Sequence, residues 1–504
     1  MHIFSLILIY SLTVLFLFYD VIILNNTFAS GDSFNPYAIH HILDKIRLSS
    51  SEWPQWQPWI FSGMPTLEAF TYVNLLYLPS FILDLLGTSD LNIQFIHLVV
   101  SAIGMFFLIR RLVGNEQIAF VSGLLWMLNP FLITMIVFGH GSQMMTAAYF
   151  PITLYFLLRL KDEQSISNML LFALFLGFQL QRAHVQIAYY ACMLLGSFFV
   201  YALFQNKNRK FASFFCVGLI IAFLIAAHIY IPSLDYRAMS IRSGDMGSFA
   251  YATNWSMHPK ELLTYIMPNY FGFGGSSYSG FMPFTDFPNY VGLFVLLFAF
   301  LSLKNLNKET IFFWSVLIIS IFLSLGKYFE IFYQFFYNYL PFFNSFRVPS
   351  MILILSNFCL YILCAYGVKD VIEIFKNKFK DFKPELIIFT FLIVSLVDIY
   401  RIDNRIINPD DDSGQQNQIT SINNFESVFK QDETISYLKD NLGLNRIYPA
   451  GSLFTDPKFK YHGIESVGGY HPAKFGHYSE LLKNSNNLLS IPVLQFLNVK
   501  YIIS

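Results

Sequence analysis

Long apolar runs restrict this chain more than any other feature, because they recur from its first residues to about residue 400. A helix that spans a bilayer needs about 20 mostly apolar residues. Only 13% of the residues are charged, against about 25% in soluble globular domains. We therefore expect a polytopic α-helical membrane protein. The eleven candidate spans are 3–24, 92–109, 117–138, 144–158, 167–181, 185–204, 211–232, 289–303, 310–326, 349–368 and 385–400.

The first run, 3–24, has the position of a signal peptide. Its apolar part is too long for one, no Lys or Arg precedes it, and ten more runs follow. We expect it to be a retained membrane helix.

The basic residues predict the orientation, because cytoplasmic loops of multispanning proteins are rich in Lys and Arg. Alternate short loops hold fourteen Lys and Arg residues, and the short loops between them hold three. We expect the N-terminus to lie inside. The long loops 25–91 and 233–288 and the tail 401–504 should then lie outside.

Three parts are expected along the chain. The membrane domain covers 1–400, a polar linker rich in acids and turn formers covers 401–425, and a small α/β domain covers 426–504. In this last part the residue pattern predicts one helix and two strands. They are 432–441, 446–450 and 497–503.

Net charge and cysteine positions exclude several classes of function. The formal net charge is zero, so nothing indicates a nucleic-acid partner. All four cysteines lie in predicted spans, so neither a disulfide framework nor a zinc site is expected. They are Cys192, Cys216, Cys359 and Cys364.

Asp32 is the residue best placed for acid–base chemistry. It follows the first run by a few residues, in 31-GDSFNPY-37, at the outer face of the membrane. A carboxylate that is desolvated on one side and open to water on the other suits a general base. The alternative is a turn aspartate that caps a helix at 36–47. Asp20, at the end of the first run, is a second carboxylate that either faces a partner or extends to the interface.

Three tryptophans and three prolines alternate in 52-EWPQWQPWIFSGMPT-66. Prolines prevent an ordinary helix here and favour an extended loop. Trp53, Trp56 and Trp59 are predicted to lie at headgroup level, where their faces can stack on sugars or lipid chains. A plain aromatic belt that re-enters the membrane is the alternative. It leaves the SGMPT turn unexplained.

Further polar groups lie at the ends of the runs that should be outside. Each one alone is more often structural, since an interfacial histidine or arginine commonly anchors or caps a helix. Together on one face they could line a pocket that suits a phosphate. They are His140, Arg182, His184, Arg237, Arg242 and Arg347.

With these residues the chain resembles the YfhO-like bacterial membrane proteins, grouped with the GT-C class of integral-membrane glycosyltransferases. The resemblance covers nearly the whole chain. It rests on GDSFNPY, the tryptophan–proline block, AHVQIAYY, PSLDYRAMSIRSG, LPFFNSFRVPS, SVGGYHPAKFGHYSELL and LNVKYII.

The resemblance implies a GT-C fold in the bacterial inner membrane, with a sugar linked to a polyprenyl phosphate as the usual donor. Asp32 matches the acidic residue of the first outer loop by position. GT-C enzymes often show paired acids there, whereas Asp32 is followed by Ser33 and Phe34, so no metal cofactor is expected. Family members commonly continue beyond LNVKYII, so part of the outer domain is expected to be missing from this chain.

The expected function is transfer of a sugar at the outer face of the membrane to an envelope glycopolymer or a lipid. Asp32 would accept the proton of the attacking hydroxyl, and arginine and histidine side chains would stabilise the departing lipid phosphate. The rival is a non-catalytic protein, either a transporter or flippase of lipid-linked sugars or a scaffold for envelope-polymer assembly. A transporter should place polar residues at mid-membrane in broken helices. Asn129 and Pro130 are the main feature of that kind.

Overall fold

The computed structural model describes residues 2–69, 76–84, 90–242, 249–379 and 383–504. Residues 243–245 of the RAMSIRSGD segment and Lys380 of the most basic loop, both used in the sequence argument, lie outside the described residues.

The chain divides into two compact units, which we call the helical unit and the mixed unit. The helical unit comprises Met1–Leu24, Leu78–Ala226 and Phe249–Ile419, and the mixed unit comprises Asn25–Tyr77, Ala227–Ser248 and Thr420–Ser504. The mixed unit thus joins parts of both long loops to most of the tail, whereas the three expected parts kept the loops with the membrane domain. The boundaries of those parts stay a prediction.

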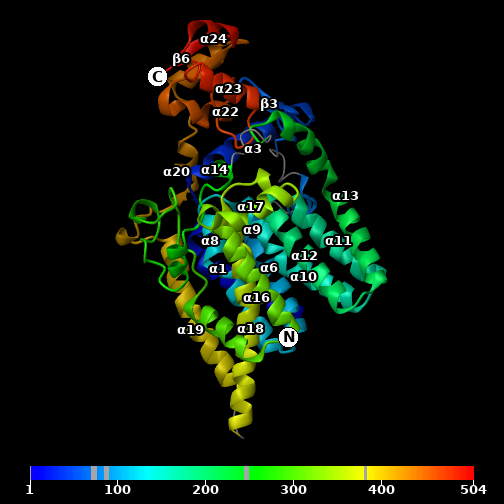
Figure 1. The fold of residues 1–504 in the computed structure, drawn as a ribbon. Helices are drawn as coiled ribbons and strands as arrows, with labels where there is room; N and C mark the ends of the chain where they lie inside the picture. Colours follow the sequence, from blue (N-terminus) through cyan, green and yellow to red (C-terminus); the bar gives the residue numbers. More distant parts are fainter. Residues whose placement is uncertain (1, 70–75, 85–89, 243–248, 380–382) are drawn as a thin grey trace. The chain divides into compact units, whose positions relative to one another are not determined.

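The helical unit is built almost entirely of helices, and Figure 1 labels most of them. Its α-helices are α1 (Ile3–Leu17), α2 (Tyr19–Ile22), α5 (Leu78–Asp84), α6 (Asp90–Val113), α7 (Glu116–Met127), α8 (Pro130–Val137), α9 (Gly141–Ala148), α10 (Phe150–Asp162), α11 (Ile166–Gln181), α12 (Val185–Gln205), α14 (Phe249–Ala252), α15 (Leu293–Leu301), α16 (Lys308–Ser324), α17 (Glu330–Tyr339), α18 (Leu353–Lys378) and α19 (Pro384–Ile407). α13 (Arg209–Met239) begins in this unit and ends in the mixed unit.

Among the described residues, five helices are long and apolar enough to cross a membrane, or six if α16 and α17 form one bent span. Three shorter apolar helices accompany them: Ile3–Leu17, Ile166–Gln181 and Leu293–Asn305. The chain is a helical membrane protein, as expected, but eleven spans are not confirmed. The run 144–158 shows one reason, because it is divided between α9 and α10 around Tyr149.

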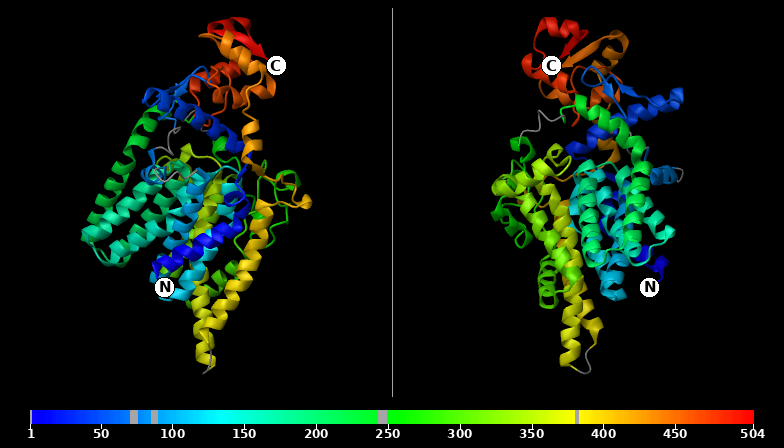
Figure 2. Two further views of the ribbon diagram at one scale, coloured as in Figure 1. Left: turned by 180° about the vertical axis from the view of Figure 1, so that it is seen from behind. Right: turned by 45° about the vertical axis from the view of Figure 1, so that its right-hand side comes forward.

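The centre of the helical unit is formed by α7, α8 and α18. In the segments Glu116–Val137 and Pro349–Lys378, 94% of the most apolar window is buried, against 28% in α13. Trp126 of α7 donates from Nε1 to Ser101 Oγ at 2.6 Å and packs its ring against Phe358 and Tyr361 of α18. In Figure 2, α1 (blue) lies beside α6, which also packs on α7 and α10.

The break between α7 and α8 has a local cause. Pro130 cannot donate a backbone hydrogen bond, and the side chain of Asn129 accepts one from Phe131 N at 3.0 Å. Asn129 therefore caps α8.

The mixed unit combines short helices with small sheets. Its helices are α3 (Gly31–Ser50), α20 (Ile422–Ser427), α21 (Glu433–Asn441), α22 (Lys458–Tyr461), α23 (Gly476–Asn484) and α24 (Ile491–Phe496). Strands β2 (Trp56–Gln57) and β3 (Met64–Pro65) pair antiparallel, and β5 (Arg446–Pro449) and β6 (Val499–Ile503) pair parallel. β1 (Asn26–Phe28) pairs with β4 (Ile419–Ser421).

The helix and the two strands expected in the tail are present as α21, β5 and β6. The helix expected at 36–47 is longer, because it begins at Gly31 and ends at Ser50. Pro36 therefore lies inside the helix. Its ring nitrogen cannot donate the usual helical hydrogen bond to the carbonyl four residues earlier.

Candidate functional site

The residues predicted for one pocket belong to both compact units. His140, Arg182, His184 and Arg347 lie in the helical unit. Asp32, the three tryptophans, Arg237 and Arg242 lie in the mixed unit. The single pocket expected from all of them stays a prediction, and each unit has its own geometry.

In the helical unit, the start of α12 meets the segment before α18. The amide Nε2 of Gln186 donates to the carbonyl oxygen of Arg347 at 2.6 Å and to Tyr190 Oη at 2.8 Å. Tyr189 donates from its hydroxyl to the carbonyl oxygen of Pro341 at 2.6 Å. The predicted segments 182–190 and 346–350 are therefore neighbours.

The backbone at this meeting point is strained. Val348 has φ 61° and ψ 70°, a conformation that a β-branched residue rarely adopts. Such strain costs about 1–3 kcal/mol and clusters at functional sites. Gln186 donates a hydrogen bond to the carbonyl of Arg347, and Pro349 begins the next helical turn. Val348 is therefore restrained on both sides.

An apolar groove of about 470 Å³ begins beside this meeting point. Two of its lining residues are Tyr189, which donates to the carbonyl of Pro341, and Leu340, which precedes Pro341. The others come from α12, α16, α17 and the start of α18: Cys192, Met193, Leu194, Gly196, Ser197, Val316, Ile319, Ser320, Leu323, Phe336, Ile352 and Leu355. α17 turns away from α16 by 109° and contributes Phe336. This lining suits a hydrocarbon chain.

Arg347 carries a positive charge in the segment between Leu340 and Ile352, two lining residues of the groove, and is not itself a lining residue. Its guanidinium lies 5.7 Å from the centre of the Tyr251 ring. Among the described residues, no carboxylate lies within ion-pair distance of it. A guanidinium held by an aromatic face keeps its donors available for an anion such as a phosphate.

The other predicted residues of this unit have structural positions. His184 caps α12, where Nδ1 accepts from Ile187 N at 3.3 Å. His140 precedes α9 and donates from its backbone to Met135 O at 2.7 Å. Arg182 directly follows α11 and is only 1% exposed. Capping accounts for the position of His184, and a role of these three residues in a pocket stays a prediction.

In the mixed unit, Asp32 is exposed in the first turn of α3, next to Ser30 at the N-cap position. Acidic side chains in a first turn interact favourably with the helix dipole. Asp32 is therefore not the cap itself, and its side chain is accessible to solvent. Its role in catalysis stays a prediction.

The tryptophan–proline block forms a hairpin that joins the tail. Phe61 N donates to Gly468 O at 2.9 Å, and Ser62 N donates to Ser466 O at 3.0 Å. Trp59 is 6% exposed and packs on Ile39, Ile42 and Leu43 of α3. Trp53 and Trp56 are 44% and 50% exposed. The SGMPT turn thus serves packing within this unit.

Arg242 also contacts the tail. It donates from Nε to Pro472 O at 3.0 Å, while Ile241 N donates to Lys474 O at 3.0 Å. Desolvation, together with the charges of Lys460 and Arg242, lowers the pKa of His471 to about 3. Arg237 lies in the last turn of α13, and its carbonyl accepts from Ser240 Oγ at 3.0 Å.

Gln186 and Tyr189 are functional candidates that residue-type reasoning passed over. Neither is charged, and neither belongs to a short motif with known chemistry. The signal available in the sequence was the segment AHVQIAYY, which places two hydrogen-bonding side chains one helical turn apart at the start of an apolar run.

No family model matches the chain, and no curated protein sequence matches it. Among the described residues, no group of three His, Cys, Asp or Glu side chains is arranged to hold a metal ion.

Solved structures do match. The archaeal oligosaccharyltransferase AglB from Archaeoglobus fulgidus, in complex with an inhibitory peptide and a dolichol-phosphate, aligns with a TM-score of 0.51 and 12% identity, over 99% of this chain and 69% of that chain. Two other structures of the Archaeoglobus fulgidus oligosaccharyltransferase give lower TM-scores. The complex with Zn and sulfate gives 0.47 at 12% identity, over 99% of this chain and 67% of that one. The form tethered through a disulfide bond to an acceptor peptide containing the NVT sequon gives 0.49 at 11% identity, over 99% and 68%.

The first of these likenesses carries the argument, and at 12% identity it concerns the fold. It confirms the expected GT-C-like fold, while the YfhO-like resemblance stays a prediction. The chain has the fold of the archaeal oligosaccharyltransferase AglB.

Proposed function

We propose that this protein is a membrane glycosyltransferase whose donor is a sugar linked to a polyprenyl phosphate. It acts at the outer face of a bacterial cytoplasmic membrane and modifies an envelope polymer or a lipid.

The groove beside Arg347 is the observation that carries this proposal. Its lining accepts a hydrocarbon chain, and the guanidinium of Arg347, in the segment between the lining residues Leu340 and Ile352, suits a phosphate. A polyprenyl phosphate combines these two features. The solved AglB structure, similar in fold, holds a dolichol-phosphate, which is a lipid of the same chemistry.

Asp32 is proposed as the general base on separate grounds, namely its place in GDSFNPY and its solvent-accessible carboxylate. It would take the proton of an acceptor hydroxyl as that oxygen attacks the anomeric carbon. The bond from that carbon to the lipid phosphate would break, and the phosphate would leave with the electron pair. Its assignment does not depend on the groove.

The groove is tested with the protein's own cysteines. Cys192 lines the groove, whereas Cys216 on α13 is exposed outside it, and Cys359 and Cys364 are buried. A membrane-permeant maleimide should modify Cys192 and Cys216. Added polyprenyl phosphate should protect Cys192 and leave Cys216 reactive, as read by mass spectrometry.

Arg347→Ala should weaken this protection about 10–100-fold in lipid concentration, because it removes a charge-assisted hydrogen bond to the phosphate. Lys327→Ala is the control, since Lys327 is an exposed cation of the same unit outside the segment that Gln186 binds. The uncharged polyprenol should protect wild type and Arg347→Ala equally. Equal protection of both proteins by polyprenyl phosphate would show that Arg347 does not bind the phosphate. No protection of Cys192 would show that the groove does not bind the lipid.

A further inference from the structure

A second cavity, of about 740 Å³, lies in the helical unit at the C-terminal end of α19. Small-molecule sites commonly occupy about 300–1,000 Å³. Its lining differs from that of the groove, because polar side chains surround it. Those that matter below are Asn269, Tyr270, Tyr290, Arg401, Asn404 and Asn408. This end of α19 is the one that the distribution of Lys and Arg predicts to be outside.

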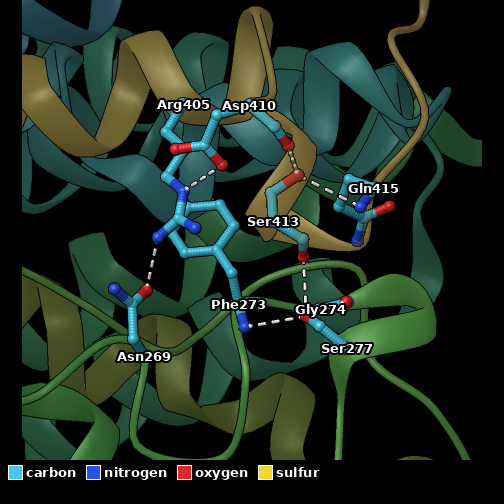
Figure 3. A network of polar contacts seen from close by, with 8 residues as sticks. All are labelled: Asn269, Phe273, Gly274, Ser277, Arg405, Asp410, Ser413 and Gln415. Atoms are coloured by element: carbon cyan, nitrogen blue, oxygen red, sulfur yellow. Dashed lines mark hydrogen bonds and ion pairs between the residues drawn. The ribbon is translucent and has the colours of Figure 1, made fainter.

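Two walls far apart in the sequence are held together by Arg405. Its Nε donates to Asp410 Oδ1 at 2.9 Å, and its Nη1 donates to Asn269 Oδ1 at 2.7 Å. The guanidinium also stacks on the Phe273 ring, 4.4 Å from its centre. Figure 3 shows this side chain between the segment of Asn269 and the segment of Asp410.

A second set of hydrogen bonds fixes the same two segments below Arg405. Ser277 donates from Oγ to Ser413 O at 2.6 Å, and Ser413 donates from Oγ to Asp410 O at 2.7 Å. Gly414, at φ 70°, lies so close that an added Cβ would be 2.4 Å from Ser277 N. The cavity walls are thus held in place before any ligand binds, which lowers the entropic cost of binding.

The charges in the lining balance. Arg405 is satisfied by Asp410, as described. Asp398 accepts from Tyr290 Oη at 2.6 Å and from Leu293 N at 2.7 Å, and Arg401 lines the same cavity. The lining therefore holds two arginines and two aspartates. Such a site gives no net attraction to a phosphate or a carboxylate.

The groups that remain are side-chain amides, a tyrosine ring and one exposed guanidinium. Asn404 and Asn408 are exposed one turn apart on α19, and each amide can donate and accept. Tyr270 is 54% exposed, which leaves its ring available. Paired donors and acceptors beside an aromatic face match the hydroxyls and the C–H face of a sugar ring.

We propose that this cavity binds a neutral saccharide, with Tyr270 stacking on a sugar ring and the amides of Asn404 and Asn408 hydrogen-bonding its hydroxyls. This proposal rests on the proposed function in one respect: the saccharide would be part of the glycosyltransferase's donor or acceptor.

The test is saccharide binding by the full-length protein in lipid nanodiscs, because glycoside detergents would compete. Saturation-transfer NMR is recorded with neutral trisaccharides and with the same sugars carrying a uronic acid or a phosphate. Wild type should bind neutral sugars more tightly than the acidic ones. Tyr270→Ala and Asn404→Ala should each weaken neutral binding about tenfold. Tyr437→Ala, which removes an equally exposed (54%) tyrosine from the mixed unit, should not.

Absence of binding to neutral sugars, preference for the acidic ones, or an equal loss in Tyr437→Ala would overturn the inference. Lipid-linked and free trisaccharides are compared to distinguish a donor from a soluble acceptor. The maleimide test on Cys192 is repeated on Tyr270→Ala, where protection by polyprenyl phosphate should be unchanged. If wild type binds no neutral saccharide while polyprenyl phosphate still protects its Cys192, this inference alone is contradicted. Saccharide binding without that protection contradicts the groove alone.

Discussion

At the scale of single residues, Lys460 shows how far burial departs from what sequence pattern predicts. It is 4% exposed, and its Nζ donates to Asn35 Oδ1 at 2.6 Å within the mixed unit. Desolvation lowers its pKa to about 8, against an ordinary value of 10.5, although Asp456 acts in the opposite direction. Lysines are almost never fully buried, so no pattern in KFKYHG indicates this position.

Lys460 gives a pH-dependent prediction. Between pH 8 and 10.5 the unfolded chain binds more protons at this residue than the folded chain does, so stability should rise with pH across that range. Over this range the free energy of unfolding should rise by about 3 kcal/mol. Lys460→Met should therefore be more stable than wild type at pH 7, and the difference should shrink as pH rises from 8 to 10.5.

Thermal unfolding of wild type and variant at several pH values measures this difference, and groups common to both cancel. Lys483→Met, at an exposed lysine of the same unit, is the control. A difference between Lys460→Met and wild type that does not change from pH 8 to 10.5 would contradict the buried, destabilising charge.

At the scale of elements, the sequence predicted where several lie but not what they touch. The alternation in 446-RIYPA-450 and 497-LNVKYII-503 correctly predicted strands, because a strand's residue pattern is local. Trp59 was predicted to lie at headgroup level, and the structure shows it packed on α3; its stacking on a sugar or a lipid chain stays a prediction. Its partners, and the tail carbonyls that bind the SGMPT turn, are brought close only by the tertiary fold.

The SGMPT turn gives a matched pair of glycine variants. Gly63 has φ +119°, and an added Cβ would be 2.5 Å from Trp56 Nε1. Gly451 has φ +60° in the same unit, with open space around it. Gly451→Ala should cost about 1 kcal/mol from backbone strain alone. Gly63→Ala should cost clearly more, because Trp56 must also move, and equal losses in thermal unfolding would contradict the packing of the turn.

At the scale of the whole molecule, composition correctly predicted a membrane protein. The eleven expected spans exceed the five or six membrane-capable helices found among the described residues. An apolar run does not reveal where a helix breaks. The segment around Tyr149 is apolar throughout yet belongs to two helices, and α16 bends sharply into α17. The mixed unit gathers 25–77, 227–248 and 420–504.

Orientation is tested by cysteine labelling with a membrane-impermeant reagent in intact cells. A cysteine at the exposed Asn417 should be modified, and one at the exposed Asn377 should not, because basic loops stay inside. Both variants are made in a background where Cys192 and Cys216 are replaced by serine. The opposite labelling pattern would place Asp32 and α19's C-terminal end on the cytoplasmic side and contradict the proposed site of action.

Sugar transfer from a polyprenyl-phosphate donor to envelope acceptors, measured with purified wild type and Asp32→Asn, tests the central claim most directly. The variant keeps the size of the side chain but removes its capacity to accept a proton. Wild type should transfer the sugar, and Asp32→Asn should turn over about 10²–10⁴-fold more slowly while polyprenyl phosphate still protects Cys192. Unchanged turnover in Asp32→Asn would remove Asp32 from the mechanism. No transfer by wild type across a broad panel of donors and acceptors would contradict the glycosyltransferase assignment and favour a non-catalytic role.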